Sequence, residues 1–242
     1  TTAVQDGDDF ILNGRKTFIS GAPMADWAIV FAKTDLTAKG SRGISMFVVD
    51  MKLPGVSLGA PEKKMGINGY PTSDVVLEDV RVSKDCLVGP LHKGFQYAMK
   101  TLDGGRLGIA SQALGIAEGA MNETVKYVKE RKQFGRSIGQ FQNTQFQLAD
   151  MAARAKAAQL MVYNAAYAKM TKPVYSVEAA MAKLFAAEAA MAITTKAVQL
   201  HGGYGYIREY EVERMMRDAK ITEIYEGTSE VQRMVISANL LK

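Results

Sequence analysis

The chain has 242 residues, of which 48% are hydrophobic and 23% are charged. A chain of this length and composition can bury a sizeable core and is not expected to be disordered. The net charge of +5 is modest, and Lys and Arg are spread along the chain, which argues against a nucleic-acid partner. One cysteine and two histidines far apart in sequence exclude an intramolecular disulfide and suggest no metal site. No run of about 18 apolar residues occurs, so no membrane-spanning segment is expected.

The first third of the chain has the pattern of β-strands. Two strand-like segments, residues 10–12 and 15–19, flank Asn13-Gly14, which predicts a hairpin with a type I′ turn. Three further strands are expected, at residues 27–33, 43–50 and 74–82. Short strands at near-regular spacing, without helices between them, predict a small antiparallel β-barrel or sandwich domain over residues 1–88.

Helical periodicity follows from residue 89 onward. Apolar residues step by three and four in segments at residues 107–128, 148–165, 177–200, 212–219 and 229–241. Ser176 is expected to cap the third of these helices. Long helices joined by short loops predict an antiparallel domain of the four-helix-bundle type over residues 89–242. The fold class is therefore α+β multidomain, with the Ala and Met stripes of the helices packed in the core.

Within the first long helix, Asp103-Gly104-Gly105-Arg106 interrupts the pattern. Two glycines destabilise a helix by about 2 kcal/mol relative to alanine, yet helical periodicity resumes directly after them. Either the helix ends here, or something passes so close that a side chain would collide with it. In the second case Asp103 and Arg106 would anchor an anionic, hydrogen-bonding ligand.

Three further stretches have both an ordinary and a functional interpretation. Phe18-Ile19-Ser20 is a plain strand end, or an aromatic face and hydroxyl for a flat cofactor. Arg131, in a basic segment closed by Gln142, suits a helix C-terminus or a phosphate. The segment at residues 199–203 ends a helix with Gly202-Gly203, which is typical of a C-cap or of a surface for a nucleotide.

Near the C-terminus, Glu226 stands between Tyr225 and Gly227, just before the last helix. Tyr225 would screen the carboxylate from water, and Gly227 would let the backbone approach a ligand. Thr228 and Ser229 are expected to cap the helix. A carboxylate in such a setting can act as a general base, although a glutamate in a polar loop is more often a solvated surface charge.

Together and in this order, the motifs resemble those of the acyl-CoA dehydrogenase family, over essentially the whole chain. Within the family the chain is most similar to the short-chain, butyryl-CoA dehydrogenase type. The matching motifs are Phe18-Ile19-Ser20-Gly21, Asp103-Gly104-Gly105-Arg106, residues 131–135, residues 202–206, residues 217–220 and Tyr225-Glu226-Gly227-Thr228. Ser20-Gly21 replaces the Thr-Asn of the family and keeps the hydroxyl.

This resemblance implies an FAD enzyme in which Glu226 is the catalytic base. Glu226 would remove the pro-R α-proton of an acyl thioester while the β-hydrogen leaves as hydride to flavin N5. Its backbone N–H would help to stabilise the charge that develops on the thioester oxygen. The residues implied to bind FAD, partly that of a neighbouring subunit, are Phe18, Ile19, Ser20, Arg131, Gln142, Gln199, Leu200, His201, Gly202, Gly203, Thr228, Ser229 and Glu230. The residues implied to bind substrate are Asp103, Gly104, Gly105, Arg106, Tyr225 and Gly227.

The resemblance further implies dehydrogenation of short-chain acyl-CoA to trans-2-enoyl-CoA, or the reverse reduction. Electrons would pass to electron-transfer flavoprotein, and the assembly would be a homotetramer in the bacterial cytoplasm or the mitochondrial matrix. Long-chain and isovaleryl members carry their base immediately before the Arg of the long helix. That position is Gly105 here, which favours the short- and medium-chain arrangement.

Two alternatives stay open. The helical N-terminal domain of the family is expected to be missing, so the chain could be an inactive piece that serves only as a helical oligomer core. A dehydrogenase of the glutaryl-CoA type, which also decarboxylates its substrate, is a close relative within the same class.

Overall fold

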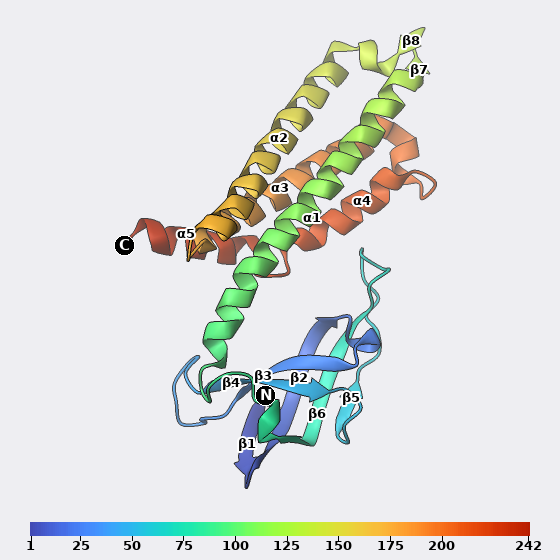
Figure 1. Cartoon of the computed structure of the whole chain (residues 1–242). Coiled ribbons are helices and arrows are strands. Elements are labelled where there is room, and N and C mark those ends of the chain that lie inside the picture. Colours follow the sequence, from blue (N-terminus) through green and yellow to red (C-terminus); the bar gives the residue numbers. More distant parts are fainter. The chain divides into compact units, whose positions relative to one another are not determined.

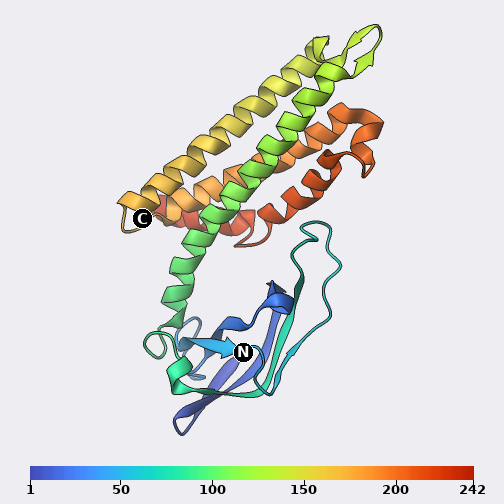
Figure 2. The same ribbon diagram turned by 45° about the vertical axis from the view of Figure 1, so that its right-hand side comes forward.

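The computed structural model describes residues 1–242. The chain divides into two compact units, Thr1–Thr101 and Leu102–Lys242, of which the first is built on a sheet and the second on helices (Figures 1 and 2). A sheet unit followed by a helical unit confirms the predicted α+β class. The division falls within α1 (Gly94–Glu130), and the domain boundary after residue 88 stays a prediction. None of the helices is long and apolar enough to span a bilayer.

The first unit contains one six-stranded sheet in the order β4-β3-β1-β2-β6-β5. Its strands are β1 (Thr2–Asp6), β2 (Asp9–Ser20), β3 (Trp27–Lys33), β4 (Ile44–Asp50), β5 (Val56–Leu58) and β6 (Thr72–Ser83). Neighbouring strands are antiparallel except β1 and β3, which are parallel, and the end strands β4 and β5 do not pair. The sheet is therefore mixed and open rather than a closed barrel. Its core includes Leu12, Phe47 and Leu77, which are completely or almost completely buried.

The predicted hairpin at Asn13-Gly14 is wrong. β2 continues through both residues, and the register against β6 shifts between Leu12 and Gly14. Gly14 has φ +142°, and the Asn13 amide exchanges hydrogen bonds with Asp79 at 2.8 and 2.9 Å. The Asn-Gly pair thus forms a bulge, because a bulge uses the same permissive glycine backbone as a turn. The hairpin turn lies earlier, at Gly7, between β1 and β2.

The second unit packs its helices around α3. The helices are α1, α2 (Gln142–Thr171), α3 (Ser176–His201), α4 (Glu211–Lys220) and α5 (Ser229–Leu240). Both views show α1, α2 and α3 side by side, with α2 running back against α1 (Figures 1 and 2). The alanines of α3 are almost all buried, and their small side chains let the neighbouring helices approach closely.

The predicted helix patterns agree with the structure in most places. The stripe on α2 is confirmed by Met151, Ala155, Ala158 and Val162, all buried. Met181 on α3 is exposed, so the expectation of a methionine core is wrong there. Ser176 is the first residue of α3 and makes no capping bond; its hydroxyl donates to Asp103 instead. α1 runs straight through Gly104-Gly105, so the alternative in which the helix ends at these glycines is wrong.

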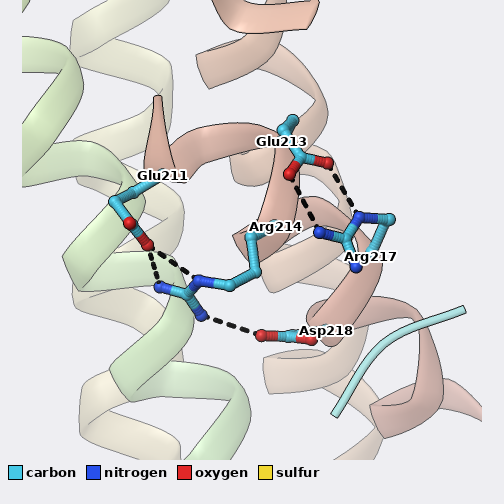
Figure 3. Close-up of polar contacts among 5 residues, drawn as sticks. All are labelled: Glu211, Glu213, Arg214, Arg217 and Asp218. Carbon is cyan, nitrogen blue, oxygen red and sulfur yellow. Dashed lines mark hydrogen bonds and ion pairs between the residues drawn. The ribbon is translucent and has the colours of Figure 1, made fainter. Parts of the chain in front are cut away.

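α4 leads through a 3-10 helix, Ile221–Glu223, into the loop that carries Glu226. Ion pairs between side chains of α4 lie along the helix (Figure 3). Arg217 forms two hydrogen bonds with the Glu213 carboxylate, at 2.7 and 2.9 Å. Arg214 pairs with Glu211 and, at 2.9 Å, with the largely buried Asp218. These pairs are spaced i,i+3 and i,i+4, the spacings that meet on one helix face. The hydrogen bonds from Arg217 hold the pKa of Glu213 below its usual value.

Replacement of Glu213 by Gln should lower the free energy of unfolding at pH 7 by about 1 kcal/mol, because the pair is mostly shielded from water. A lowered pKa in the folded state stabilises the fold above the unfolded pKa, about 4.3. The difference between wild type and Glu213→Gln should therefore shrink as the pH falls below that value. Urea unfolding at several pH values measures it.

Glu211→Gln is the matched control, since the Glu211 side chain is 59% exposed and its loss should change stability by less than about 0.5 kcal/mol. Equal effects of the two variants, or a Glu213→Gln effect that does not change down to pH 3, would contradict this role for the Arg217 pair.

Candidate active site

Glu226 lies in the loop between a 3-10 helix, Ile221–Glu223, and α5. Glu226 has φ +54° and Gly227 has φ +88°, so both residues are in the left-handed region. Glycine adopts this conformation freely, but a residue with a Cβ is destabilised by roughly 1–2 kcal/mol. The loop therefore holds Glu226 in a conformation that its own backbone disfavours, a feature that clusters at functional sites.

The Glu226 carboxylate lies over Gly105 of α1. A Cβ placed on Gly105 would come 2.4 Å from Glu226 Oε2 and 2.9 Å from Cδ. Real atoms do not approach this closely, so the carboxylate occupies space that any other residue at position 105 would fill. The glycine in the middle of a long helix is thus explained by the close approach of Glu226, which was the second alternative left open by the sequence.

Asp103 and Arg106 form a shielded pair one turn apart on α1. Arg106 Nη1 donates to Asp103 Oδ1 at 2.7 Å, and the Arg106 side chain is 8% exposed. The Ser176 hydroxyl donates to the other oxygen of Asp103. Arg106 Nε is buried and has no hydrogen-bond partner. The two residues that the sequence predicts as polar anchors are therefore ordered, and one buried donor remains free.

Tyr225 covers the same region from the loop side. Its hydroxyl donates to Gln112 Oε1 of α1, and burial raises the pKa of Tyr225. The phenol is therefore neutral at physiological pH and acts as a donor. Gln112 is a residue that the sequence analysis did not identify.

Two further residues beneath the loop were also missed. Lys183 of α3 is completely buried, and its Nζ donates to the Gly227 carbonyl at 2.7 Å. Gln232 of α5 is completely buried as well, and its Nε2 donates to the carbonyls of Glu226 and Gly227 at 3.2 and 2.8 Å. A lysine between buried alanines on an otherwise apolar helix face was the available signal for Lys183.

The first residues of α5 complete this end of the unit. Thr228 is the N-cap, and its hydroxyl accepts from the Val231 N–H at 3.4 Å, as the sequence predicts. Ser229 is buried, and its hydroxyl has no partner. Glu230 is exposed. The helix start therefore presents one free buried hydroxyl close to the Glu226 loop.

A second group of predicted residues lines a hollow of ≈ 620 Å³ at the other end of α1 and α3. The predicted residues in its wall are Arg131, Gln199, Leu200, His201, Gly202 and Gly203. The Arg131 guanidinium lies over the Tyr204 ring, 5.1 Å from its centroid. Neither Gly202 nor Gly203 has an atom within 4 Å of the position that a Cβ would take. Gln142, exposed at the start of α2, is not part of this wall.

His201 is fixed within the wall of this hollow. Its ring stacks on Tyr127 with centroids 4.2 Å apart, and Nδ1 lies 2.8 Å from the Ala197 carbonyl. Burial lowers the pKa of His201, so the imidazole is neutral at pH 7. A neutral ring stacked on tyrosine shapes the hollow and does not act as a cation toward an anionic ligand.

In the first unit, Phe18 is held in an unusual conformation. It has φ +58° and its side chain is 70% exposed, at a register shift between Lys16 and Ile19. Its N–H donates to the buried Asp74 at 3.3 Å, and Asp74 pairs with Arg15. The bonds from Arg15 lower the pKa of Asp74, which keeps the acceptor ionised. Ser20, two residues on, is exposed, and its hydroxyl lies 3.4 Å from that of Thr72.

Within the second unit the predicted residues fall into two groups. One surrounds Glu226 and Gly105, and the other lines the hollow at Arg131. Gly105 lies within α1, and Arg131 is the residue directly after this helix. The two are 26 positions apart, so the distance between them along the helix axis is roughly 39 Å at 1.5 Å per residue. The two groups of one chain are therefore too far apart to surround the same ring system.

Two family models match successive parts of the chain. The family model described as "Acyl-CoA dehydrogenase, C-terminal domain" matches residues 92–241, and the model described as "Acyl-CoA dehydrogenase, middle domain" matches residues 1–80. The chain belongs to the acyl-CoA dehydrogenase family.

Among its relatives, the chain is 58% identical to the 3-(aryl)acrylate reductase of Clostridium sporogenes. It is 57% identical to CarC, the subunit of the caffeyl-CoA reductase-Etf complex of Acetobacterium woodii. Each alignment covers 100% of this chain and 64% of the relative. The solved structure of butyryl-CoA dehydrogenase from Megasphaera elsdenii superimposes with a TM-score of 0.98 at 49% identity, over 100% of this chain and 63% of that one. The chain thus spans about two thirds of the length of the relatives it matches.

Replacement of Gly105 by Ala should displace the Glu226 carboxylate, because the new methyl group would overlap it. Gly108, on the same helix, has no atom within 4 Å of its Cβ position and is the matched control. Both changes should favour the helix by about 1 kcal/mol. The midpoint temperature of thermal unfolding should therefore not fall in either variant. Crystal structures should show a moved Glu226 side chain in Gly105→Ala alone. An unmoved carboxylate there would contradict the close approach.

Proposed function

We propose that this chain provides the catalytic base and much of the cofactor site of an FAD-dependent acyl-CoA dehydrogenase acting on short-chain thioesters. The observation that carries the proposal is the left-handed turn at Glu226, which places its carboxylate over the side-chain-free surface of Gly105. Membership of the family and likeness to butyryl-CoA dehydrogenase support the same reaction class. The predicted roles of the site residues remain part of this proposal.

The residues present suit FAD. Arg131 supplies a cation for a phosphate, Gly202 and Gly203 leave open space beside it, and the exposed Phe18 offers a flat apolar face. Ser20 offers a hydroxyl near that face, and Ser229 a buried hydroxyl without a partner. FAD, when bound, supplies the acceptor for the hydride that leaves the β-carbon.

The side chains of this chain account for the other half of the reaction. The α C–H bond of the thioester breaks, its proton moves to a carboxylate oxygen of Glu226, and its electron pair forms the new C=C bond as the β-hydrogen departs. The backbone N–H of Glu226 would donate to the thioester oxygen, where negative charge develops. A side chain at position 227 would displace Gln232, because a Cβ there would lie 2.9 Å from Gln232 Nε2, and it would strain the backbone at φ +88°. Asp103 and Arg106 would line the approach for the thioester.

Reduction of a double bond is the second candidate for the direction of the reaction. Two relatives that are more than 50% identical to this chain are named a 3-(aryl)acrylate reductase and a subunit of a caffeyl-CoA reductase-Etf complex. Reduction of an enoyl or arylacrylyl thioester is therefore the alternative to dehydrogenation. The name of the second also places it in a complex with Etf, which supports electron-transfer flavoprotein as the redox partner here. Rates with butyryl-CoA, crotonyl-CoA and caffeyl-CoA would separate the candidates, and CO₂ release from glutaryl-CoA would identify the decarboxylating type.

In the holoenzyme, Glu226→Gln should lower kcat for acyl-CoA oxidation by about 10²- to 10⁴-fold, since an amide cannot accept the α-proton. Dye reduction by butyryl-CoA, expressed per bound flavin, measures this. Glu188→Gln, an exposed glutamate of α3, is the control and should keep full activity. Unimpaired turnover in Glu226→Gln would disprove the assignment of the base, and a protein without visible flavin absorption would favour the inactive oligomer core.

We also propose a homo-oligomer formed through α2. Leu160, Tyr163, Tyr167 and Met170 of α2 are 57–84% exposed and follow each other at steps of three and four, which aligns them on one face of the helix. Exposed apolar stripes of this size mark interfaces. A second copy would also explain the two groups of site residues that lie roughly 39 Å apart in one chain, because each could then serve a different FAD.

The double variant Tyr167→Glu with Met170→Glu should dissociate the oligomer, since charges in a buried apolar interface are destabilising. Multi-angle light scattering should show a smaller species than for wild type. Asn164→Glu adds a charge to the same helix about 100° around from Tyr163 and should leave the mass unchanged. A wild-type monomer would contradict the proposal.

A further inference from the structure

The loop that carries Glu226 rests on two completely buried polar side chains from different helices. Lys183 reaches it from α3, and Gln232 reaches it from the first turns of α5. Between them they donate three hydrogen bonds to two consecutive carbonyls, those of Glu226 and Gly227. Neither side chain is exposed to a ligand, and neither was required for the chemistry described above.

A buried ammonium group is unfavourable unless the fold uses it. Lys183 lies among Ala179, Ala180, Ala182 and Ala186, all completely buried, and burial lowers the pKa of Lys183 to about 8. The charged groups nearest to it are Arg106 on α1, Glu223 in the 3-10 helix, Glu226 itself and Glu230 on α5. Its hydrogen bond in the structure is to the Gly227 carbonyl, at 2.7 Å. The hydrogen bond of this lysine is therefore with the loop backbone.

The loop backbone needs such support. Glu226 and Gly227 are consecutive left-handed residues, and their carbonyls point toward α3 and α5. There Lys183 and Gln232 donate hydrogen bonds to them. If these donors were lost, Glu226 could relax to the ordinary right-handed or extended region. Its Cα–Cβ bond would then point in another direction, and the carboxylate would leave the surface of Gly105.

We propose that Lys183 and Gln232 are positioning residues that clamp the backbone of Glu226 and Gly227 and thereby aim the Glu226 carboxylate at the substrate. This inference rests on the proposed function, because it assigns the two residues a role in the step performed by Glu226. Lys183 acts through the Gly227 carbonyl and takes no proton from the substrate. Gln232 acts in the same way from α5, through the carbonyls of Glu226 and Gly227.

The test compares Lys183→Met and Gln232→Met with wild type in the full-length holoenzyme. Methionine keeps most of the volume of either side chain and removes the donor. We expect kcat per bound flavin to fall about 10- to 100-fold, since a displacement of about 1 Å in a reacting group has an effect of this size, while KM changes less than about threefold. Lys196→Met, on the same helix and without a hydrogen bond to the loop, should keep the wild-type kcat.

Crystal structures of the two variants provide a readout that does not depend on activity. We expect Glu226 to leave the left-handed region and its carboxylate to move away from Gly105. A Glu226 that keeps φ near its wild-type value in both variants would overturn the clamp, as would an unchanged kcat per bound flavin. If Lys183→Met does not fold, Gln232→Met decides alone, because it removes the bonds from the other helix.

The same experiments separate failure of the clamp from failure of the proposed function. If wild type and Glu226→Gln have equal activity, the base assignment fails, whatever the variants of Lys183 and Gln232 show. If Glu226→Gln is inactive while both methionine variants keep full kcat and the wild-type loop, the clamp alone is disproved.

Discussion

The close approach of Glu226 to Gly105 is the contact on which the proposed site in the helical unit depends. It requires a helix without a side chain at position 105 and a loop that presents a glutamate in a left-handed conformation. Both requirements are locally unfavourable, since glycine weakens a helix and a Cβ disfavours positive φ. They are met together only when α1, α3 and α5 hold their positions firmly.

The packing of α3 supplies that rigidity. Its buried alanines allow neighbouring helices to lie close, so displacement of one helix would disturb many contacts. The ion pairs of Arg214 and Arg217 along α4 stabilise the segment that leads into the Glu226 loop. Lys183 crosses from this core to the loop backbone. The site is therefore built on helices, and only the Glu226 turn itself is irregular.

The sheet unit also contains an exposed residue with positive φ that a buried polar group supports. Phe18 is exposed and has positive φ at a register shift in β2. The buried Asp74, which pairs with the exposed Arg15, accepts a hydrogen bond from its N–H. In both units a residue proposed to face the cofactor or substrate thus stands in a strained conformation, held by polar groups that are themselves buried. Pre-organisation of this kind keeps a reacting group in place before the ligand arrives.

Much of this could be predicted from the sequence. The change from period two to period 3.6 near residue 90 indicated a β unit followed by helices, because each periodicity reflects which face of an element is buried. The order of the short motifs indicated the family, and the role of Glu226 as a base stays a prediction. Thr228 was predicted as a cap because capping depends on neighbours three residues away.

Other features depended on contacts between distant segments, which local pattern does not encode. Asn13-Gly14 suits a turn or a bulge equally well, and pairing with β6 decided for the bulge. Gly105 suits a helix end or a close approach, and the return of the chain 121 residues later, at Glu226, decided between them. Lys183 and Gln232 belong to helices whose sequences contain no known motif. Sequence by itself determined the change from strands to helices and the family. Only the tertiary structure decided which buried groups meet beneath the Glu226 loop, because the hydrogen bonds there join residues from helices far apart in the chain.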